Sequence, residues 1–555
     1  MLREPNSTVK ILAFVVIGVL AIFAAVYADS ATTTVNVSNS APSFTAGPAE
    51  NPASTTSVPV NVGSNVTFQA TATDANTNQY YLAICKTDGI TAGDDTSPTC
   101  NSGTWCISSA TNSGSQASCN YTVLVGDTNM SYAWYGFVCD KVSGGGSCSS
   151  SSQGSGDSGS PFYTNHRPSY SGVDDNGPKN PGQQVTFTAT ASDSDTHNSQ
   201  QDQVKLVVCK TEGISGTACD GGAGDTYCTS SFVDSNPTCN YDIPIPTLDD
   251  DYTYYAYVFD NFGFEASGHQ TDSFSVNNVN PVVSSVALNS GNNITLTENT
   301  TTNITITGTV TDNNSCTDLS SVVTSLYRSG ITYSGCDAGG ESDNNNCYPN
   351  VSCSAVGSGN TCEGSSDTSV DYTCTVTVQF HADPTDGGSS DTIYYSQNWL
   401  TTIKATDDDA GSGNTEVSTG VEMSSLIALN ITGTINYGSL APGGDSGSSP
   451  QSTTATNTGN VGLDIEVSGT TMTGPGTPIP IGNQEYKATT FTYGSGTDLS
   501  GTPTEMELNI LKTITTGSPA TKSLYWGLGI PAGQLSGAYS GSNTIGAVRG
   551  EVSEW

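Results

Sequence analysis

Apolar and polar residues alternate at period two in short segments along most of this chain. In residues 185–191 (VTFTATA) every second side chain is apolar, with threonine between, which is the pattern of a β-strand with one buried face. Residues 252–260 (YTYYAYVFD) form a second such segment, rich in aromatic side chains. Turn-forming residues separate these segments at short intervals, as in β-sandwiches. Beyond its first thirty residues the chain is therefore predicted to be all-β.

One segment occurs twice, as LAICKTDGI and again as LVVCKTEGI further along the chain. The match extends upstream, where NVTFQATATD corresponds to QVTFTATASD, and downstream, where CNYTV corresponds to CNYDI. Each copy begins with Asn-x-x-Pro, at Asn39 and Asn165, and a diverged third copy opens with the same motif at Asn278. The last part of the chain has no cysteine but again contains alternating segments such as LDIEVSG. The repeats predict four β-sandwich domains, at residues 37–164, 165–277, 278–420 and 421–555.

The early strand VTFTATASDSD and the late aromatic strand ending VFDNFG resemble the Ig-like and PKD-like domains of bacterial and archaeal cell-surface proteins. The resemblance covers about residues 37–420. The strand-turn NTGN near residue 457 is similar to sandwich modules of prokaryotic envelope proteins. This resemblance implies tandem Ig-like domains on a cell surface. The aromatic residues of the late strands, including Trp134 and those of 252–257, are expected in the core and not in sugar-binding sites.

The N-terminus has the pattern of a secretory signal. Arg3 and Lys10 precede an apolar run over residues 11–25, and the small-residue step VYA ends at Ala28. We expect residues 1–28 to be a signal peptide cleaved after Ala28. The run is almost long enough to span a bilayer, so an uncleaved anchor helix is the alternative. Both place the remaining chain in an extracellular or cell-surface location.

The charge balance narrows the range of partners. The chain has 52 Asp and Glu but only 14 Lys and Arg, for a net charge of −38. Nucleic acids and anionic membrane surfaces require basic patches on their partners. No nucleic acid is therefore expected as a partner, and the membrane is expected to contact only the N-terminal segment if this stays uncleaved.

Sixteen cysteines lie between Cys85 and Cys374, and none of them forms a Cys-x-x-Cys motif. An even number without metal-ligand spacing indicates disulfides in an oxidising compartment. Two cysteines occur only in the first copy, so their joint presence predicts that they pair. For the shared cysteines, sequence neighbours are favoured among the three connectivities of each set, and no pairing is predicted from Cys316 onward. The predicted disulfides are Cys139–Cys148, Cys85–Cys100, Cys106–Cys119, Cys209–Cys219 and Cys228–Cys239.

Aspartates end the strands that an Ig-like sandwich brings to one pole. Converging carboxylates beside turn carbonyls suit Ca²⁺, which prefers oxygen ligands. The alternative is that these aspartates cap turns through hydrogen bonds to the backbone. The aspartates expected to approach one another are Asp74 with Asp140, Asp193 or Asp195 with Asp260, and Asp312 with Asp407. No other cofactor is predicted.

No catalytic constellation is found in the sequence. GDSGSP at 156–161 resembles the serine-protease motif around Ser158, but that family needs a histidine earlier in the chain, and the first one here is His166. We therefore expect a protein that is not an enzyme and that mediates adhesion by binding a cell-surface glycan or protein. Two alternatives stay open: a surface-layer or fibre subunit that binds neighbouring subunits, and a secreted carbohydrate-active enzyme with accessory modules.

Overall fold

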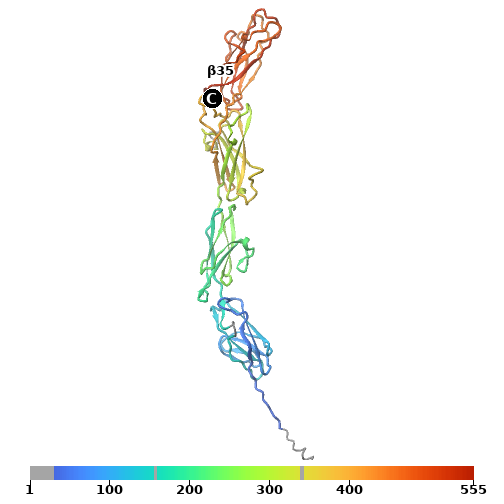
Figure 1. Cartoon of the computed structure of the whole chain (residues 1–555), viewed down its shortest axis with the longest axis vertical. Coiled ribbons are helices and arrows are strands. Elements are labelled where there is room, and N and C mark those ends of the chain that lie inside the picture. The colour runs from blue at the N-terminus through green and yellow to red at the C-terminus, as the bar shows by residue number, and fades with distance from the viewer. Residues whose placement is uncertain (1–30, 155–158, 338–342) are drawn as a thin grey trace, which may run out of the picture.

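The computed structural model describes residues 31–154, 159–337 and 343–555. The predicted signal peptide or anchor and Ser158 lie outside these residues. Within them, no helix has the length and apolar character needed to cross a membrane. The described chain is almost entirely β-strand, as predicted, and its strands fall into four modules that follow one another end to end (Figure 1). The C-terminus returns to the boundary between the third and fourth modules (Figure 1).

The first module is a sandwich of two three-stranded sheets. Val66, Phe68 and Leu82 from the alternating segments fill its core with the fully buried Trp134. Trp134 donates from Nε1 to Glu50 at 3.0 Å, so this ring is a core residue, as expected. The sheets have the orders β1-β3-β8 (Ser43–Glu50, Asn65–Thr73, Gln116–Thr122) and β10-β4-β7 (Tyr135–Asp140, Tyr80–Cys85, Thr104–Ile107). Beside the sandwich lie a third three-stranded sheet, β2-β11-β9 (Val60–Asn61, Phe162–Asn165, Ser131–Tyr132), and a two-stranded sheet, β5-β6 (Ile90–Thr91, Thr99–Cys100).

The second module repeats this sandwich, with four strands instead of three in one of its two sheets. Tyr254 is fully buried and packs edge-on against Phe187, joining the two predicted segments across the core. A three-stranded sheet facing a four-stranded one is an Ig-like arrangement. The sheets are β12-β13-β20 (Ser169–Asp175, Gln184–Ser192, Thr238–Asp242) and β19-β16-β21-β22 (Thr226–Thr229, Val204–Cys209, Asp251–Asp260, Gln270–Ser275). The shorter elements are β14 (Thr196–His197), β15 (Gln200–Gln201), β17 (Ile214–Ser215), β18 (Ala218–Cys219) and the 3₁₀ turn η1 (Gly222–Asp225).

The third module is one continuous sheet that closes on itself around the buried Trp399, since β23 packs on β28 and β29. Its core extends beyond the predicted limit of residue 420, because Val421 and Met423 are buried in it. The sequence does not signal this longer limit, because the segment after residue 420 pairs only through isolated bridges and lacks a strand pattern. The order is β23-β24-β27-β26-β25-β28-β29 (Val282–Leu288, Thr301–Thr311, Ser369–Gln379, Cys347–Ala355, Leu319–Arg328, Trp399–Asp407, Ser412–Glu416). The short helices are η2 (Asn289–Gly291), η3 (Cys316–Asp318) and α2 (Tyr333–Asp337).

The fourth module is a sandwich of five and three strands around the fully buried Trp526. Its sheets are β30-β31-β36-β33-β34 (Leu429–Thr432, Gln451–Asn457, Thr521–Leu528, Gln484–Lys487, Thr497–Asp498) and β35-β32-β37 (Thr504–Ile510, Leu463–Gly469, Asn543–Arg549). Two 3₁₀ turns, η4 (Ile481–Asn483) and η5 (Val552–Glu554), complete it.

Eight disulfides join the cysteines of the first three modules. Two of them, Cys106–Cys119 and Cys228–Cys239, link the two sheets of their sandwich. The pairs in the first two modules are those that the spacing predicts: Cys85–Cys100, Cys106–Cys119, Cys139–Cys148, Cys209–Cys219 and Cys228–Cys239. The third module, for which no pairing was predicted, contains Cys316–Cys362, Cys336–Cys347 and Cys353–Cys374.

Candidate metal centres at the module boundaries

In each of the first three modules, the predicted aspartates lie at the end of the sandwich where the chain enters the module. We call this end the pole of the module. The Asn-x-x-Pro motif explains this position, because its asparagine enters the pole and donates from Nδ2 to the aspartate that ends the late aromatic strand. Asn165 donates to Asp260 at 2.7 Å and Asn278 to Asp407 at 3.1 Å. In the first module Asn39 makes the equivalent bond to Asp140. The repeated motif thus marks one repeated site.

The other aspartate of each pole caps a turn with one carboxylate oxygen only. Asp74 Oδ1 accepts from Asn76 N at 2.7 Å, Asp193 Oδ1 from Asp195 N at 2.9 Å, and Asp312 Oδ1 from Asn314 N at 2.8 Å. The second oxygen, Oδ2, is buried in all three, and within the described part of the chain it finds no hydrogen-bond partner. A buried carboxylate oxygen without a donor is costly. Turn capping therefore uses Oδ1 of each carboxylate and leaves Oδ2 available to a ligand.

The second module gathers three buried carboxylates at its pole. Oxygens of Asp193, Asp195 and Asp202 lie within 4.8 Å of one another, and these side chains are 1–3% exposed. Burial, with Asp195, Asp260 and Asp202 nearby, raises the pKa of Asp193 to about 7.

Two histidines connect this pole to the first module. His166 Nδ1 lies 3.0 Å from Asp195 and its Nε2 lies 2.6 Å from the Asp127 carbonyl of the first module. His197 Nδ1 lies 2.8 Å from Asp202, and its Nε2 lies 3.1 Å from the Thr164 carbonyl. Each ring therefore lies between a carboxylate of the second module and a carbonyl oxygen of the first. Although burial opposes protonation, the Asp127 carbonyl and Asp195 raise the pKa of His166.

The third module brings Asp312, Asp318 and Asp407 together at its pole, with ligand oxygens within 4.8 Å and all three side chains buried. Burial and the neighbouring carboxylates raise the pKa of Asp318 to about 8. The Oδ2 of Asp318, like that of Asp312, has no hydrogen-bond partner in residues 31–154, 159–337 and 343–555.

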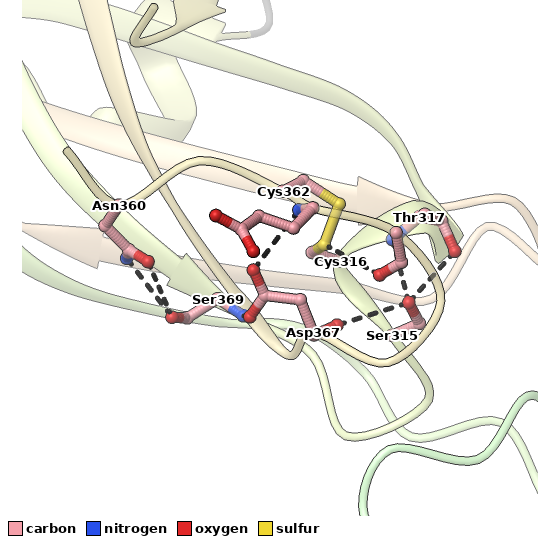
Figure 2. The surroundings of a disulfide bond; sticks show 9 residues. Ser315, Cys316, Thr317, Asn360, Cys362, Asp367 and Ser369 are labelled. Carbon is pink, nitrogen blue, oxygen red and sulfur yellow. Dashed lines mark hydrogen bonds between the residues drawn. A yellow bond between two sulfur atoms is a disulfide. The ribbon is translucent and has the colours of Figure 1, made fainter. Parts of the chain in front are cut away.

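A disulfide positions Asp318. Figure 2 shows Cys362 joined to Cys316, which begins the turn η3 that carries Asp318. Cys316 N donates to the Asp367 carbonyl at 2.8 Å, so the loop after Cys362 is also fastened to this turn. The pole of the third module is therefore built on a covalently anchored segment.

The first module has a smaller set. Asn39 contacts Asp140 and accepts from Asn78 at 3.3 Å, while Asp74 caps the turn before Asn78. In the described residues, no third carboxylate joins Asp74 and Asp140 in a cluster. This pole therefore offers fewer charged ligands than the other two.

These poles suit a hard divalent cation. Two carboxylates 4 Å apart repel by about 4 kcal/mol near a protein surface, and a cation between them removes that repulsion. Carboxylate, amide and carbonyl oxygens are the ligands that Ca²⁺ prefers. The sequence reasoning missed Asp202 and Asp318, because they come from loops that differ between the copies, and no shared motif marks them.

No protein-family model and no curated protein matches the chain. Among solved structures, it is similar to a tetra-tandem repeat from the extending region of a large adhesion protein, at 12% identity and TM-score 0.29, covering 88% of this chain and 96% of that one. It is also similar to extracellular cadherin domains 3–6 of protocadherin gamma B2, at 13% identity and TM-score 0.27, covering 92% and 99%. Fibronectin(III)-like modules of Clostridium thermocellum CbhA match at 14% identity and TM-score 0.19, covering 41% and 92%. With such low TM-scores, none of these likenesses bears on function. The strand pairing of the chain itself defines its class, which is a chain of tandem Ig-like β-sandwich modules.

Proposed function

We propose that the protein is an extracellular binding rod that mediates adhesion at a cell surface, with module poles that bind Ca²⁺. The observation that carries the proposal is the end-to-end order of the four modules (Figure 1). Such an order places the last module far from the first. Disulfides in the first three modules and a secretory pattern in the sequence support an extracellular location.

The fourth module carries the proposed contact site. A groove of about 390 Å³ lies between β30 and β37, and Thr434, Tyr437, Gln484 and Asn543 are among the residues that line it. The apolar side chains of Ile431, Ile435, Met472 and Ile545 also line it, so the groove suits a partner with both apolar and polar surface, such as a glycan or a protein loop. Absence of enzymatic activity stays a prediction.

Substitution of an exposed residue tests the groove. T434R places a long side chain at its mouth, whereas T432R adds the same charge at an exposed strand position outside the lining. With the purified, secreted chain, T434R should lower binding to the target cell surface at least about tenfold, and T432R should not, since only the first obstructs the groove. Equal binding by both variants would exclude the groove as the contact site.

Protease shaving of intact source cells tests the location. Release of peptides from residues 37–555 is expected. Recovery of the intact chain in the medium alone would contradict surface display. Ordered filaments or lattices of the purified chain would favour the structural-subunit alternative, and hydrolysis of a polysaccharide would favour the enzyme.

A further inference from the structure

The boundary between the second and third modules brings together carboxylates from both sides. Asp249 lies in the loop before β21 of the second module, and Asp408 and Asp409 directly follow β28 of the third. Oxygens of these three side chains lie within 4.8 Å of one another. The predicted pole site includes none of them.

Asp318 connects this group to the pole of the third module. Asp408 N donates to the Asp318 carbonyl at 2.9 Å. The Asp318 side chain is 4% exposed, and its Oδ2 has no hydrogen-bond partner in the part of the chain that the structure describes. Its carboxylate lies close to Asp408 as well as to Asp312 and Asp407, so it is near both groups of acidic side chains.

A buried asparagine holds the two modules in this position. Asn314 Nδ2 lies 3.2 Å from the Thr247 carbonyl of the second module and 3.1 Å from the Asn277 carbonyl of the linker. Its Oδ1 accepts from Val279 N at 2.7 Å, and its side chain is fully buried. Because Thr247 lies two residues before Asp249, these bonds set the loop of the second module above the carboxylates of the third.

We propose that a divalent cation, Ca²⁺ by its ligand chemistry, binds across this boundary between Asp249 of the second module and Asp408 and Asp409 of the third, beside the buried Asp318. The inference rests on the proposed Ca²⁺ binding by the poles and adds a ligand from a second module. With the ion bound, the carboxylates attract a common centre and fix the angle between the modules. Without it, they repel one another and the joint opens.

The boundary between the third and fourth modules provides an internal contrast. There Asp383 of the third module contacts Lys512 of the fourth at 3.1 Å, and Arg328 contacts the same carboxylate at 3.1 Å. Protein cations neutralise this boundary, so its geometry does not require an added ion. Cation dependence is therefore expected at the joint between the second and third modules and not at the joint between the third and fourth.

Three variants of the full secreted chain separate the joint from the pole. D249N removes the ligand of the second module. D250N makes the same charge change one residue away, at an exposed side chain outside the cluster whose Oδ1 accepts from Asp251 N. D312N removes a ligand of the pole. CaCl₂ alone is the probe, titrated by calorimetry into chelator-treated protein.

The joint is measured by a distance distribution between spin labels placed, through incorporated unnatural amino acids, at the exposed Ser273 and Thr375. Wild type and D250N should give a narrow distribution with Ca²⁺ and a broad one with chelator. D249N should stay broad with Ca²⁺ and should bind one ion at least about tenfold more weakly, because the site loses a charged ligand.

The outcomes distinguish the two proposals. Calcium binding that D312N weakens but D249N leaves unchanged would keep the pole sites and overturn the bridging site. No calcium binding by the wild-type chain would overturn both. A distribution that stays narrow in chelator would also overturn the inference, since the joint would then be rigid without an ion.

Discussion

The buried ion cluster between the third and fourth modules can be tested by replacing its one carboxylate. Asp383 is 4% exposed and lies 3.1 Å from both Arg328 Nε and Lys512 Nζ. Lys512 Nζ also donates to Asn345 Oδ1 at 2.9 Å, across the same boundary. Burial raises the pKa of Asp383 and lowers that of Lys512, and their contact partly offsets both shifts. D383N removes the negative charge with little change in shape.

The expected cost follows from the geometry. Without Asp383, the two buried cations lose the carboxylate that contacts both of them, and removing one partner of a buried pair costs about 3–5 kcal/mol of unfolding free energy. D391N is the matched control. It breaks the Arg549–Asp391 pair of the same boundary, which spans 3.6 Å with a carboxylate that is 42% exposed, so its cost should stay below about 1 kcal/mol.

Calorimetry of the full chain measures the difference. D383N should lower the melting transition of the last two modules by roughly 6–20 °C, since a kilocalorie per mole shifts a unit of about 150–250 residues by about 2–4 °C. D391N should leave that transition almost unchanged. If D383N shifted it no more than D391N does, the buried cluster would not stabilise the boundary, and the reasoning would be wrong.

Two further predictions concern the poles. Replacing Cys316 and Cys362 by serine should destabilise the third module by up to about 4 kcal/mol in denaturant, because the disulfide closes a loop of 46 residues. The same change should weaken calcium binding, because Asp318 is no longer held in place. An unchanged calcium titration would refute this second expectation. In chelator, the second module should melt higher at pH 5 than at pH 7.5. Asp193, with its pKa raised to about 7 by burial, holds a proton in the folded state that the unfolded chain releases near pH 4, so stability falls as pH rises between these values. The raised pKa of His166 acts in the same direction, and a transition independent of pH would contradict both assignments.

Different kinds of polar contact join adjacent modules at the three module boundaries. Between the first and second modules, His166 and His197 connect carboxylates to carbonyl oxygens of the preceding module. Between the second and third, carboxylates face one another around Asp318. Between the third and fourth, Lys512 crosses to Asp383. The first two boundaries should therefore respond to divalent cations, whereas the third, where Lys512 and Arg328 neutralise Asp383, does not require one.

The sequence by itself determined the repeated local structure. Period-two alternation specifies strands with one buried face, and the strands of 184–192 and 251–260 formed where it occurs. Cysteines close in sequence paired with one another in the first two modules, since short loops leave few other partners within reach. The Asn-x-x-Pro motif and the strand-ending aspartates met at one pole, because equivalent strands of a sandwich end on the same side.

Only the tertiary structure decided which side chains lie beside the predicted aspartates and which modules contact one another through them. Asp202, Asp318 and Asp249 come from loops whose lengths differ between modules, so no periodic signal places them beside the predicted aspartates. Lys512 and Asp383 are far apart in the chain and in different modules, and their contact depends on the angle at which two folded sandwiches pack. Local alternation fixes which side of a strand is buried, whereas contacts between loops of separate modules depend on packing that no short segment encodes.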